Sequence, residues 1–500
     1  MSATRRPTVG LDFGTSTTSV ASPRGVVPIG TDESWMPSVV GYGDVSIVAG
    51  EEALELDPSQ LVRSIKRAIT DNRTFVRVDT PTGIRDVRAD DLIVALLREA
   101  ADRAVARGQD LSGGRAVQLG CPAMWDGRQR TRLVELARRA GLAVSLASLV
   151  DEPVAAGIAW LARREVRTPQ RLLVFDMGGG TLDIAVLNVG KDVSVLAALG
   201  VAEAGDALDE LIAEDLDNAL GASGVDVDSL SAPRRARGRL RDAAREAKIG
   251  LSTMEEHVVV LPRRLFGISD LWYTREQLNA VFAPQLDRAE LYVEAALRAA
   301  QLTGHVPGTA SDILRTPFEE LAAAVDVVLL SGGMSQVPYV AQRLRELFPL
   351  PTAIEVAATP PESAVVLGLA NAARYGRINM YRPAFDILLE WNHGRESRTV
   401  YHAYTPLVET RQIARGGDIR YERNGTELSL PPTGKGKLKV VSHSGHRVRA
   451  TLGVRSLDGF PVALNEEKFE FAIYPNGRIS LTDGSGTHDG HIADWNLSGT

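Results

Sequence analysis

The sequence predicts a layered α/β region followed by a smaller all-β region. From Thr8 to about Arg374, short apolar runs rich in β-branched residues alternate with long Ala-, Leu-, Arg- and Glu-rich stretches of helical spacing, which is typical of layered α/β folds. After Met380 the pattern changes to aromatic and β-branched runs separated by Asn-Gly, Gly-Gly, Asp-Gly and Pro-Pro pairs, which indicates strands joined by turns. A chain of 500 residues is long enough for about three packed units.

Each element follows from its local pattern. In the α/β region, apolar runs predict strands at 9–13, 116–120, 172–175, 184–189 and 325–330. Apolar residues at helical spacing predict helices at 92–107, 128–140, 154–164, 208–220, 234–251, 275–302 and 337–347. The all-β region offers strands at 385–391, 400–404, 419–421, 438–442, 448–454, 469–473 and 479–481, with Asn476-Gly477 as a hairpin turn. We expect a small sandwich there, and an insertion at 303–324.

Composition and charge argue against several classes of function. The net charge of −7, without a basic domain, argues against a nucleic-acid partner. The most apolar stretches are shorter than the ~20 residues that a membrane-spanning helix needs, and the N-terminus lacks the apolar run of a signal peptide. The single cysteine, Cys121, cannot form an intramolecular disulfide and fits a reducing compartment. We therefore expect a cytoplasmic protein that binds neither nucleic acid nor membrane.

One pattern occurs twice in the α/β region. In each copy an apolar strand delivers an aspartate, Asp12 or Asp176, and a glycine-rich turn with hydroxyl side chains follows before a second strand. The residues of the two turns are Gly14, Thr15 and Ser16 in the first copy, and Gly178, Gly179, Gly180 and Thr181 in the second. The pattern predicts a duplicated β-hairpin.

These turns are suited to phosphate. Glycines leave backbone N–H groups free to approach phosphate oxygens, and hydroxyls add further donors. An aspartate beside each turn suits Mg²⁺ held through its water shell. Two ordinary hairpins with turn glycines are the alternative. A P-loop segment is absent from the sequence, and Gly178-Gly179-Gly180 precedes a strand rather than the helix that a dinucleotide fingerprint requires.

Further stretches extend this pattern into a family resemblance. They are 64–67, 121–130, 150–160, 246–252, 273–278, 327–338 and 361–368. Together with the two hairpins they resemble the actin-like ATPase superfamily and, more narrowly, the DnaK-type heat-shock-70 chaperones. The resemblance implies a duplicated actin-like (ribonuclease-H-like) two-lobed ATPase domain at 1–376, a linker at 377–392 and a smaller β-sandwich-like substrate-binding domain at 393–482. The family's helical lid is not expected here, because 483–500 is rich in Gly, Ser and His, has no helical periodicity and predicts a flexible tail.

The resemblance also implies roles at the phosphate end. It matches Thr15 and Thr181 to phosphate-binding hydroxyls, and Asp12 and Asp176 to the carboxylates of the Mg²⁺ water shell. Lys66 matches a lysine at the γ-phosphate and its attacking water, whereas Glu152 and Asp183 match acidic groups near metal and water. Positioning and charge neutralisation are what phosphoryl transfer needs. The implied cofactors are ATP or ADP with Mg²⁺.

At the base end the resemblance implies an adenosine site with departures. Its matching residues are Gly332, Gly333, Ser335, Lys248 and Ser252, and Glu362 stands in place of the usual aspartate of the closing motif. Arg245 and Ile249 stand where the family commonly has acidic and arginine side chains, and Gln336 stands where it has an arginine. These departures predict weaker adenine binding. Pro122 and Arg130 match the proline and arginine that couple the nucleotide state to the neighbouring domain, the alternative being a helix-entry loop.

The expected function is that of an ATP-dependent chaperone that binds unfolded or extended protein segments, with a J-type co-chaperone or nucleotide exchange factor as possible partners. The weak similarity of 385–390 and 469–481 to the family's linker and closing hairpin leaves peptide binding open. The alternatives are a small-molecule kinase of the same superfamily and a nucleotide-dependent scaffold or regulatory protein. The histidine pairs 443/446 and 488/491 lack cysteine partners, which favours surface histidines over zinc ligands.

Overall fold

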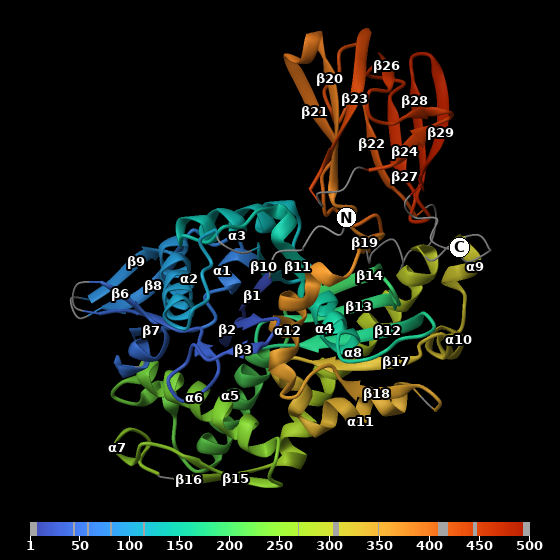
Figure 1. Cartoon of the computed structure of the whole chain (residues 1–500). Coiled ribbons are helices and arrows are strands. Elements are labelled where there is room, and N and C mark those ends of the chain that lie inside the picture. Colours follow the sequence, from blue (N-terminus) through green and yellow to red (C-terminus); the bar gives the residue numbers. More distant parts are fainter. Residues whose placement is uncertain are drawn as a thin grey trace.

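Two α/β lobes form the larger part of the molecule, and a β part stands at one end of them (Figure 1). The computed structural model describes residues 8–43, 46–57, 60–80, 83–113, 116–268, 270–303, 310–348, 350–408, 419–443 and 448–493. The alternation of strands and helices up to η7 (Ala372–Arg374) confirms the α/β region, and the strands that follow confirm the all-β region.

The sheet of the first lobe has the order β11-β10-β1-β2-β3, with β4 pairing with β2. Strand β1 is antiparallel to β2 and parallel to β10, and β10 is parallel to β11. The bounds are β1 (Thr8–Phe13), β2 (Thr17–Ser22), β3 (Gly25–Val27), β4 (Met36–Pro37), β10 (Ala116–Cys121) and β11 (Leu149–Asp151).

The sheet of the second lobe repeats this plan, in the order β18-β17-β12-β13-β14-β19. Strand β12 is antiparallel to β13 and parallel to β17, and β17 is parallel to β18. The bounds are β12 (Gln170–Met177), β13 (Leu182–Val189), β14 (Val193–Val201), β17 (Val327–Ser331), β18 (Ala353–Val356) and β19 (Arg377–Asn379). The predicted duplication is therefore confirmed at the level of strand order and direction.

Two helices, α4 and α12, each follow the sheet of one lobe in the chain and pack on the sheet of the other. Helix α4 (Glu152–Leu161) follows the first sheet but packs on β12 and β13 of the second, whereas α12 (Ala364–Asn371) follows the second sheet and packs on β1 and β2 of the first. The two helices also contact each other, and Gly368 lies so close to α4 that a Cβ there would be 1.7 Å from the Ala155 carbonyl oxygen. This pair joins the two lobes.

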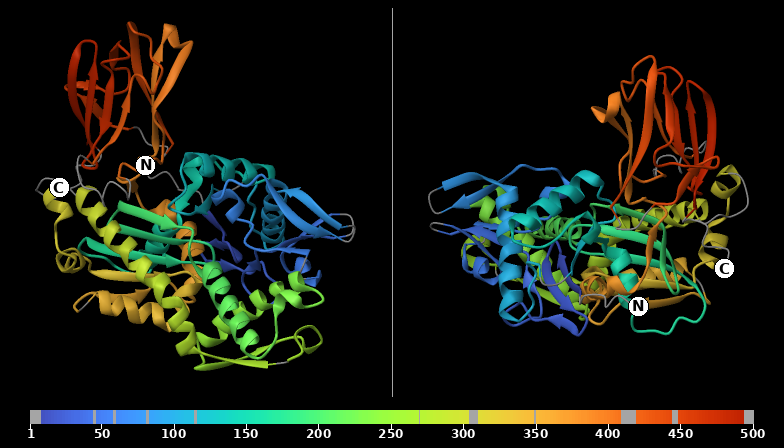
Figure 2. Two further views of the ribbon diagram at one scale, coloured as in Figure 1. Left: turned by 180° about the vertical axis from the view of Figure 1, so that it is seen from behind. Right: turned by 45° about the horizontal axis from the view of Figure 1, so that its top comes forward.

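The remaining helices cover the outer faces. Helices α2 (Ala89–Ala106) and α3 (Gly127–Arg139) belong to the first lobe, whereas α5 (Gly205–Ala222), α6 (Pro233–Leu251) and α8 (Arg275–Thr303) belong to the second. Figure 2 shows the long helix α8 crossing the second sheet, where it contacts β13 and β14. Shorter helices are α1 (Arg67–Thr70), α7 (Arg263–Phe266), α9 (Ala310–Leu314), α10 (Phe318–Ala323) and α11 (Pro338–Leu347).

Three small sheets complete the lobes. They comprise β5 (Val40–Tyr42), β6 (Ile47–Ala49) and β7 (Leu61–Val62); β8 (Phe75–Thr80) and β9 (Gly83–Arg88); and β15 (Glu256–Val260) and β16 (Asp270–Thr274). The expected insertion at 303–324 contains α9 and α10, which pack on α8, and its residues 304–309 lie outside the described residues.

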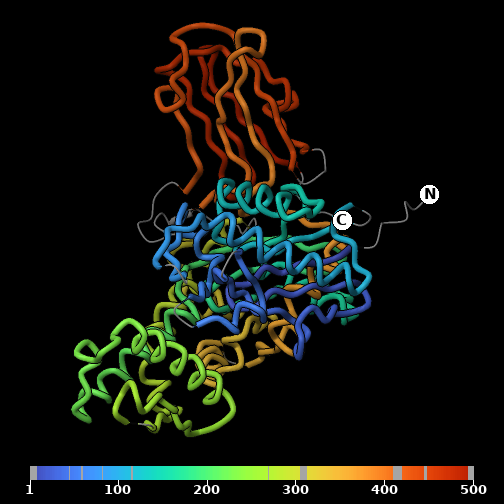
Figure 3. Tube along the Cα trace, turned by 90° about the vertical axis from the view of Figure 1, so that its left-hand side faces the viewer, coloured from blue at the N-terminus to red at the C-terminus, as the bar shows by residue number. Residues whose placement is uncertain are grey.

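The β part consists of two sheets, which Figure 3 shows side by side at one end of the molecule. The first has the order β21-β20-β23-β26, with bounds β20 (Phe385–Trp391), β21 (Glu396–Tyr401), β23 (Gly434–Ser442) and β26 (Pro461–Leu464). The second has the order β22-β27-β28-β29-β24-β25, with bounds β22 (Tyr421–Asn424), β24 (Ala450–Leu452), β25 (Arg455–Ser456), β27 (Glu470–Ile473), β28 (Arg478–Asp483) and β29 (Gly486–Ile492). Buried Leu389, Leu438, Phe471 and Leu481 contribute to the core of this part.

Two expectations at the edges of the β part are wrong. Residues 377–392 were expected to form a linker, but β19 pairs with β14 of the second lobe and β20 is an inner strand of the β part. Residues 483–500 were expected to form a flexible tail, but β29 pairs with both β28 and β24; residues 494–500 of this stretch lie outside the described residues. Strands β19, β20 and β29 use their backbone groups in sheet hydrogen bonds, which neither a linker nor a tail requires.

Candidate functional site

The two predicted turns have the same local structure. In the first, the Gly14 N–H donates to the Thr17 carbonyl at 3.0 Å. In the second, the Gly178 N–H donates to the Thr181 carbonyl at 3.0 Å. Each turn connects two antiparallel strands of its own sheet, so the sequence repeat corresponds to a structural repeat.

The fold brings the two turns face to face. A Cβ atom at Gly180 would lie 2.6 Å from the Thr15 Oγ1, and one at Gly179 would lie 2.4 Å from the Ser16 Oγ. Any larger side chain at these glycines would push the turns apart. The close approach explains why hydroxyl residues in one turn meet glycines in the other.

A cavity of about 570 Å³ opens between the lobes at these turns. Its wall includes sixteen of the predicted site residues, namely Asp12, Gly14, Thr15, Ser16, Lys66, Glu152, Asp176, Gly178, Gly179, Gly180, Thr181, Lys248, Ser252, Gly332, Gly333 and Glu362. Asp183 and Ser335 lie beside the cavity rather than on its wall.

One end of the cavity gathers buried charges from both lobes. Asp12 lies at the end of β1, and Asp176 lies on β12 directly opposite Asp183 of β13. Glu152 begins helix α4, where the helix N-terminus favours a negative charge. Lys66, only 3% exposed, donates to the Glu152 Oε1 at 2.5 Å.

The carboxylates of this cluster outnumber the positive charges beside them. Burial, followed by the charge of Glu152, raises the pKa of Asp12 and that of Asp183 to about 7. Burial and Glu152 also raise the pKa of Asp176 well above its ordinary value. Burial acts to lower the pKa of Lys66, but Glu152 and Asp12 raise it overall. Four carboxylic acids face one lysine, so the site fits an additional cation.

The mode of cation binding is constrained by geometry. Across the described ranges, no three His, Cys, Asp or Glu side chains are placed so that they could hold a metal ion directly. Asp12 and Asp176 approach the cavity from opposite lobes. A Mg²⁺ ion that keeps several waters and binds phosphate oxygens fits this donor set, because Mg²⁺ dehydrates reluctantly.

Lys248 organises the second-lobe side of the cavity. Its Nζ donates to the Gly205 carbonyl at 3.0 Å and lies 2.6 Å from the Asp209 Oδ1. The Gly205 N–H in turn donates to the Gly178 carbonyl at 3.1 Å. Burial, despite Asp209, lowers the pKa of Lys248. Ser252 is one turn further along, and its hydroxyl donates to the Lys248 carbonyl at 3.1 Å.

The predicted adenosine turn forms after β17. Gly332 has φ +79° and packs so closely that a Cβ there would lie 2.3 Å from the Met177 carbonyl oxygen, which explains the glycine. The Ser335 hydroxyl donates to the Gly332 carbonyl at 2.7 Å. Gln336 donates to Glu362 Oε2 at 3.0 Å, so these two side chains form a pair at the cavity.

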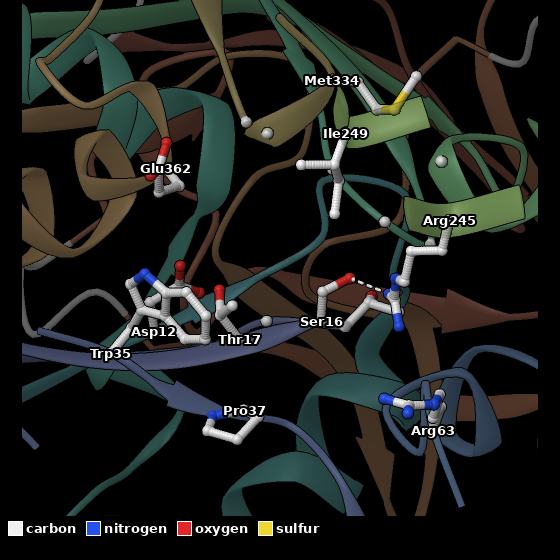
Figure 4. A pocket seen from close by; sticks show the side chains of 18 of the residues that line it. Asp12, Ser16, Thr17, Trp35, Pro37, Arg63, Arg245, Ile249, Met334 and Glu362 are labelled. Atoms are coloured by element: carbon white, nitrogen blue, oxygen red, sulfur yellow. Dashed lines mark hydrogen bonds between the residues drawn. The ribbon is translucent and has the colours of Figure 1, made fainter. Parts of the chain in front are cut away.

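Several wall residues carry no sequence signal. Trp35, Pro37, Val39, Leu54 and Arg63 come from the first lobe. Strand β4 pairs with β2 at Thr17 and brings Trp35 and Pro37 next to the first turn. Figure 4 shows Trp35 and Thr17 on the same side of the cavity, with Ile249 and Met334 on the other. This placement depends on non-local pairing, so no short motif could have identified these residues.

Arg130 lies between the first lobe and the β part. It is 1% exposed, its Nη2 lies 2.6 Å from the Asp151 Oδ1, and its guanidinium lies 4.6 Å from the centre of the Tyr404 ring. Asp151 directly precedes Glu152 of the buried cluster. Pro122 is buried, and its carbonyl accepts from the Trp125 N–H at 3.2 Å.

The histidines of the β part have individual partners. The His443 Nε2 lies 2.7 Å from the Asp386 Oδ2, and the His488 Nε2 lies 3.6 Å from the Asp483 Oδ1. His491 Nε2 lies 3.1 Å from the Asn476 carbonyl oxygen. His446 lies outside the described residues.

Among the described residues, no helix combines the length and the apolar character that a membrane-spanning helix needs.

Comparisons with known proteins agree with this architecture. The family model described as Hsp70 protein matches residues 93–375. A chaperone protein HscA homolog of Photobacterium profundum is 30% identical over 95% of this chain and 76% of its own length. A chaperone protein DnaK of Thermotoga petrophila is 29% identical over 73% of this chain and 59% of its own. The chloroplastic heat shock 70 kDa protein 6 of Arabidopsis thaliana is 28% identical over 95% and 67%.

Hsp70 proteins are ATPases that use ATP or ADP with Mg²⁺, which agrees with the turns and the carboxylates of the cavity. The family also has a two-lobed actin-like ATPase and a β-sandwich. The family model covers more than half of the residues, and the similarity to the HscA homolog extends over almost all of them. The chain therefore belongs to the Hsp70 family.

Proposed function

We propose that this protein is an ATP-dependent molecular chaperone in which Mg-ATP hydrolysis between the lobes controls the binding of protein segments by the β part. The observation that carries the proposal is the pair of facing turns with buried carboxylates at one end of the cavity. Thr15 and Gly180 come from different lobes and meet at close range. A ligand bound between the turns would hold the lobes together, so its hydrolysis would change their relative position.

The proposal assigns the buried cluster to hydrolysis. Asp12 and Asp176 hold a hydrated Mg²⁺, which when bound neutralises charge on the phosphates. Lys66, fixed by Glu152, places its ammonium at the γ-phosphate and its attacking water. Glu152 and Asp183 orient that water. This division of roles suits phosphoryl transfer, in which positioning and charge neutralisation supply most of the catalysis.

The rest of the wall binds the nucleotide. The two turns, Gly14–Ser16 and Gly178–Gly180, hold the phosphates with the N–H groups that point into the cavity and with the hydroxyls of Thr15 and Thr181, while the Gly14 and Gly178 N–H groups close the turns. The adenosine is bound by six residues, namely Lys248, Ser252, Gly332, Gly333, Ser335 and Glu362. The engagement of Lys248 by Asp209 and of Glu362 by Gln336 supports the expectation of weaker adenine binding.

The β part supplies the second activity in this proposal. Residues 1–376 act as the nucleotide-binding unit, and the strands from β20 onward act as the unit that binds unfolded or extended segments. Arg130 connects Asp151 of the first lobe with Tyr404 of the β part. We place the protein in the cytoplasm, with a J-type co-chaperone or exchange factor as regulatory partners.

Steady-state ATPase activity of the full chain, measured with and without a panel of unfolded peptides, tests the proposal. We expect Mg²⁺-dependent hydrolysis that at least one peptide stimulates. Hydrolysis stimulated instead by a sugar or polyol, with its phosphorylation, would identify a kinase and overturn the chaperone function. Hydrolysis unaffected by every peptide, with nucleotide-dependent polymerisation seen by light scattering, would favour a scaffold and overturn it as well.

A further inference from the structure

Arg245 of helix α6 reaches across the cavity to the first lobe. Its Nη2 donates to the Ser16 Oγ at 3.0 Å, the contact drawn as a dashed line in Figure 4. Ser16 belongs to the first turn and lies against Gly179 of the second. The guanidinium therefore lies where the two turns meet, although the sequence expectation placed Arg245 at the adenosine end.

The carboxylates nearest to the Arg245 guanidinium lie beyond hydrogen-bonding distance. The nearest carboxylates are those of Asp206, at 4.0 Å, and Asp209, at 3.9 Å. Each has a closer partner, because the Ser64 hydroxyl donates to Asp206 at 2.6 Å and Lys248 lies 2.6 Å from Asp209. At these distances Arg245 forms no bidentate carboxylate pair, so its planar donor edge stays available to a ligand.

A second guanidinium lies close by. Arg63 lines the same cavity, and its Nε lies 3.5 Å from the Asp242 Oδ1. Burial lowers the pKa of Arg63, Asp242 opposes this, and the positive charge of Arg245 lowers it further. Figure 4 shows Arg63 and Arg245 at the same end of the cavity. Two neighbouring cations that repel each other are stabilised by a bound anion.

At the base end, the charged side chains Lys248 and Glu362 already have partners, and apolar residues lie beside them. Ile249 is one helical turn after Arg245, lines the cavity and is 63% exposed. Met334 and Val337 are further apolar residues of the wall on the second-lobe side. These apolar contacts add affinity for a base without discriminating between bases, because they offer no hydrogen bonds to the base edges.

We infer that Arg245, assisted by Arg63, is a binding residue for the phosphate chain of the nucleotide. The inference rests on the proposed function and adds to it that affinity depends on the number of phosphates more than on the base. A guanidinium suits this role because its planar fork matches the geometry of phosphate oxygens.

Titration calorimetry of the full chain with ATP, ADP, AMP and adenosine tests the inference, comparing Arg245→Gln with Arg241→Gln. Arg241 is a matched control because it lies one turn earlier on α6, is 56% exposed and pairs with Glu210. For Arg245→Gln we expect ADP and ATP affinity to fall about 10- to 100-fold, the range for a lost charge-assisted hydrogen bond. Adenosine affinity and the Arg241→Gln variant should stay at the parent values.

A second measurement separates phosphate binding from a simple contact between the lobes. The ADP affinity of the parent should weaken with added salt, and Arg245→Gln should lose part of that dependence. If Arg245→Gln lost adenosine and ADP affinity equally, or kept both the ADP affinity and the salt dependence of the parent, the inference would be overturned. ATP hydrolysis by the parent would still support the proposed function in either case. An Arg245→Glu variant that binds ADP as tightly as the parent would overturn it too, since it would indicate contact with ribose hydroxyls.

Discussion

The side chain of Lys66 illustrates how far a single residue can be understood from sequence. By itself, a lysine at the start of a short helix would be expected on the surface, yet Lys66 is buried against Glu152 and near the rings of Phe13 and Trp125. The surrounding Ser64–Arg67 stretch identified it through resemblance. Its burial follows from the lobe packing, which places Glu152 of α4 opposite the loop before α1.

Replacing Lys66 by alanine should separate hydrolysis from binding. We expect kcat for ATP hydrolysis to fall by about 100-fold or more, because removal of a group that stabilises transferring charge costs a few kcal/mol, whereas ATP affinity should change little. Single-turnover hydrolysis and equilibrium binding of ATP would measure the two quantities.

Lys191→Ala is the control for this experiment, because Lys191 is exposed in the turn between β13 and β14. It should behave as the parent. A Lys66→Ala protein that hydrolyses ATP at the parent rate would show that the assigned mechanism is wrong.

Cys121 gives a pH-dependent prediction. Burial, partly opposed by Arg130, raises the pKa of the Cys121 thiol from its ordinary 9.0 to about 12. The folded protein should therefore keep the thiol protonated and unreactive at pH 8. Because the folded pKa is the higher one, the stability that this group contributes is complete below pH 9 and decreases as the pH rises from about 9 to about 12.

Thiol titration with an aromatic disulfide reagent at pH 8 would check this prediction directly, since Cys121 is the one cysteine of the chain. We expect slow labelling of the native protein and rapid labelling after unfolding in urea. Equal rates in the two states would show that the thiol is accessible and that the burial is incorrect.

At the scale of elements, the clearest requirement lies where α4 and α12 cross. Gly368 of α12 allows the two helices to approach until a Cβ would lie 1.7 Å from the Ala155 carbonyl oxygen. Gly368→Ala should therefore reduce the free energy of unfolding by about 1–3 kcal/mol or more, because the helix backbones must separate. Urea unfolding followed by circular dichroism would measure the change.

Gly221 provides the matched control in helix α5, because a Cβ there would meet open space. Gly221→Ala should stabilise the protein by about 0.5–1 kcal/mol, since glycine is a poor helix former. Destabilisation of similar size by both variants would contradict the explanation from close packing.

The elements also show why two expectations, the tail and the linker, were wrong. Strand β29, GTHDGHI, has almost no apolar residues, so its composition is typical of a tail. It becomes a strand because it pairs with β28 and β24, and Gly490 permits an approach in which a Cβ would lie 1.7 Å from the Thr451 carbonyl oxygen. Strand β20 alternates buried and half-buried residues, which confirms the strand predicted at 385–391, and only the family resemblance assigned this stretch to a linker.

At the scale of the whole molecule, Tyr404 of the β part makes several contacts with the first lobe. Its ring packs on the Arg130 guanidinium at 4.6 Å, and its hydroxyl donates to the Leu146 carbonyl at 3.3 Å. The backbone N–H of Tyr404 donates to the Pro383 carbonyl at 2.9 Å. These contacts connect the β part to the residue that holds Asp151.

Tyr404→Ala should loosen the β part from the lobes. We expect a larger radius of gyration in small-angle X-ray scattering and loss of any stimulation of ATP hydrolysis by peptides, while basal hydrolysis persists. Tyr404→Phe keeps the ring and should retain both properties, since a stacked guanidinium is attracted by the ring itself. An unchanged scattering profile for Tyr404→Ala would show that this contact does not hold the two parts together.

The sequence by itself determined the duplicated hairpin, the long helices of the lobes and the residue types of the two turns, because these depend on local periodicity and on glycine, hydroxyl and carboxylate chemistry. Tertiary structure decided that Gly180 meets Thr15, that Arg245 turns toward Ser16 rather than the base end, that Trp35 lines the cavity and that β29 is a strand. Each of these features joins segments far apart in the chain. Only packing between the lobes and pairing between distant strands bring such segments together, and neither leaves a local pattern in the sequence.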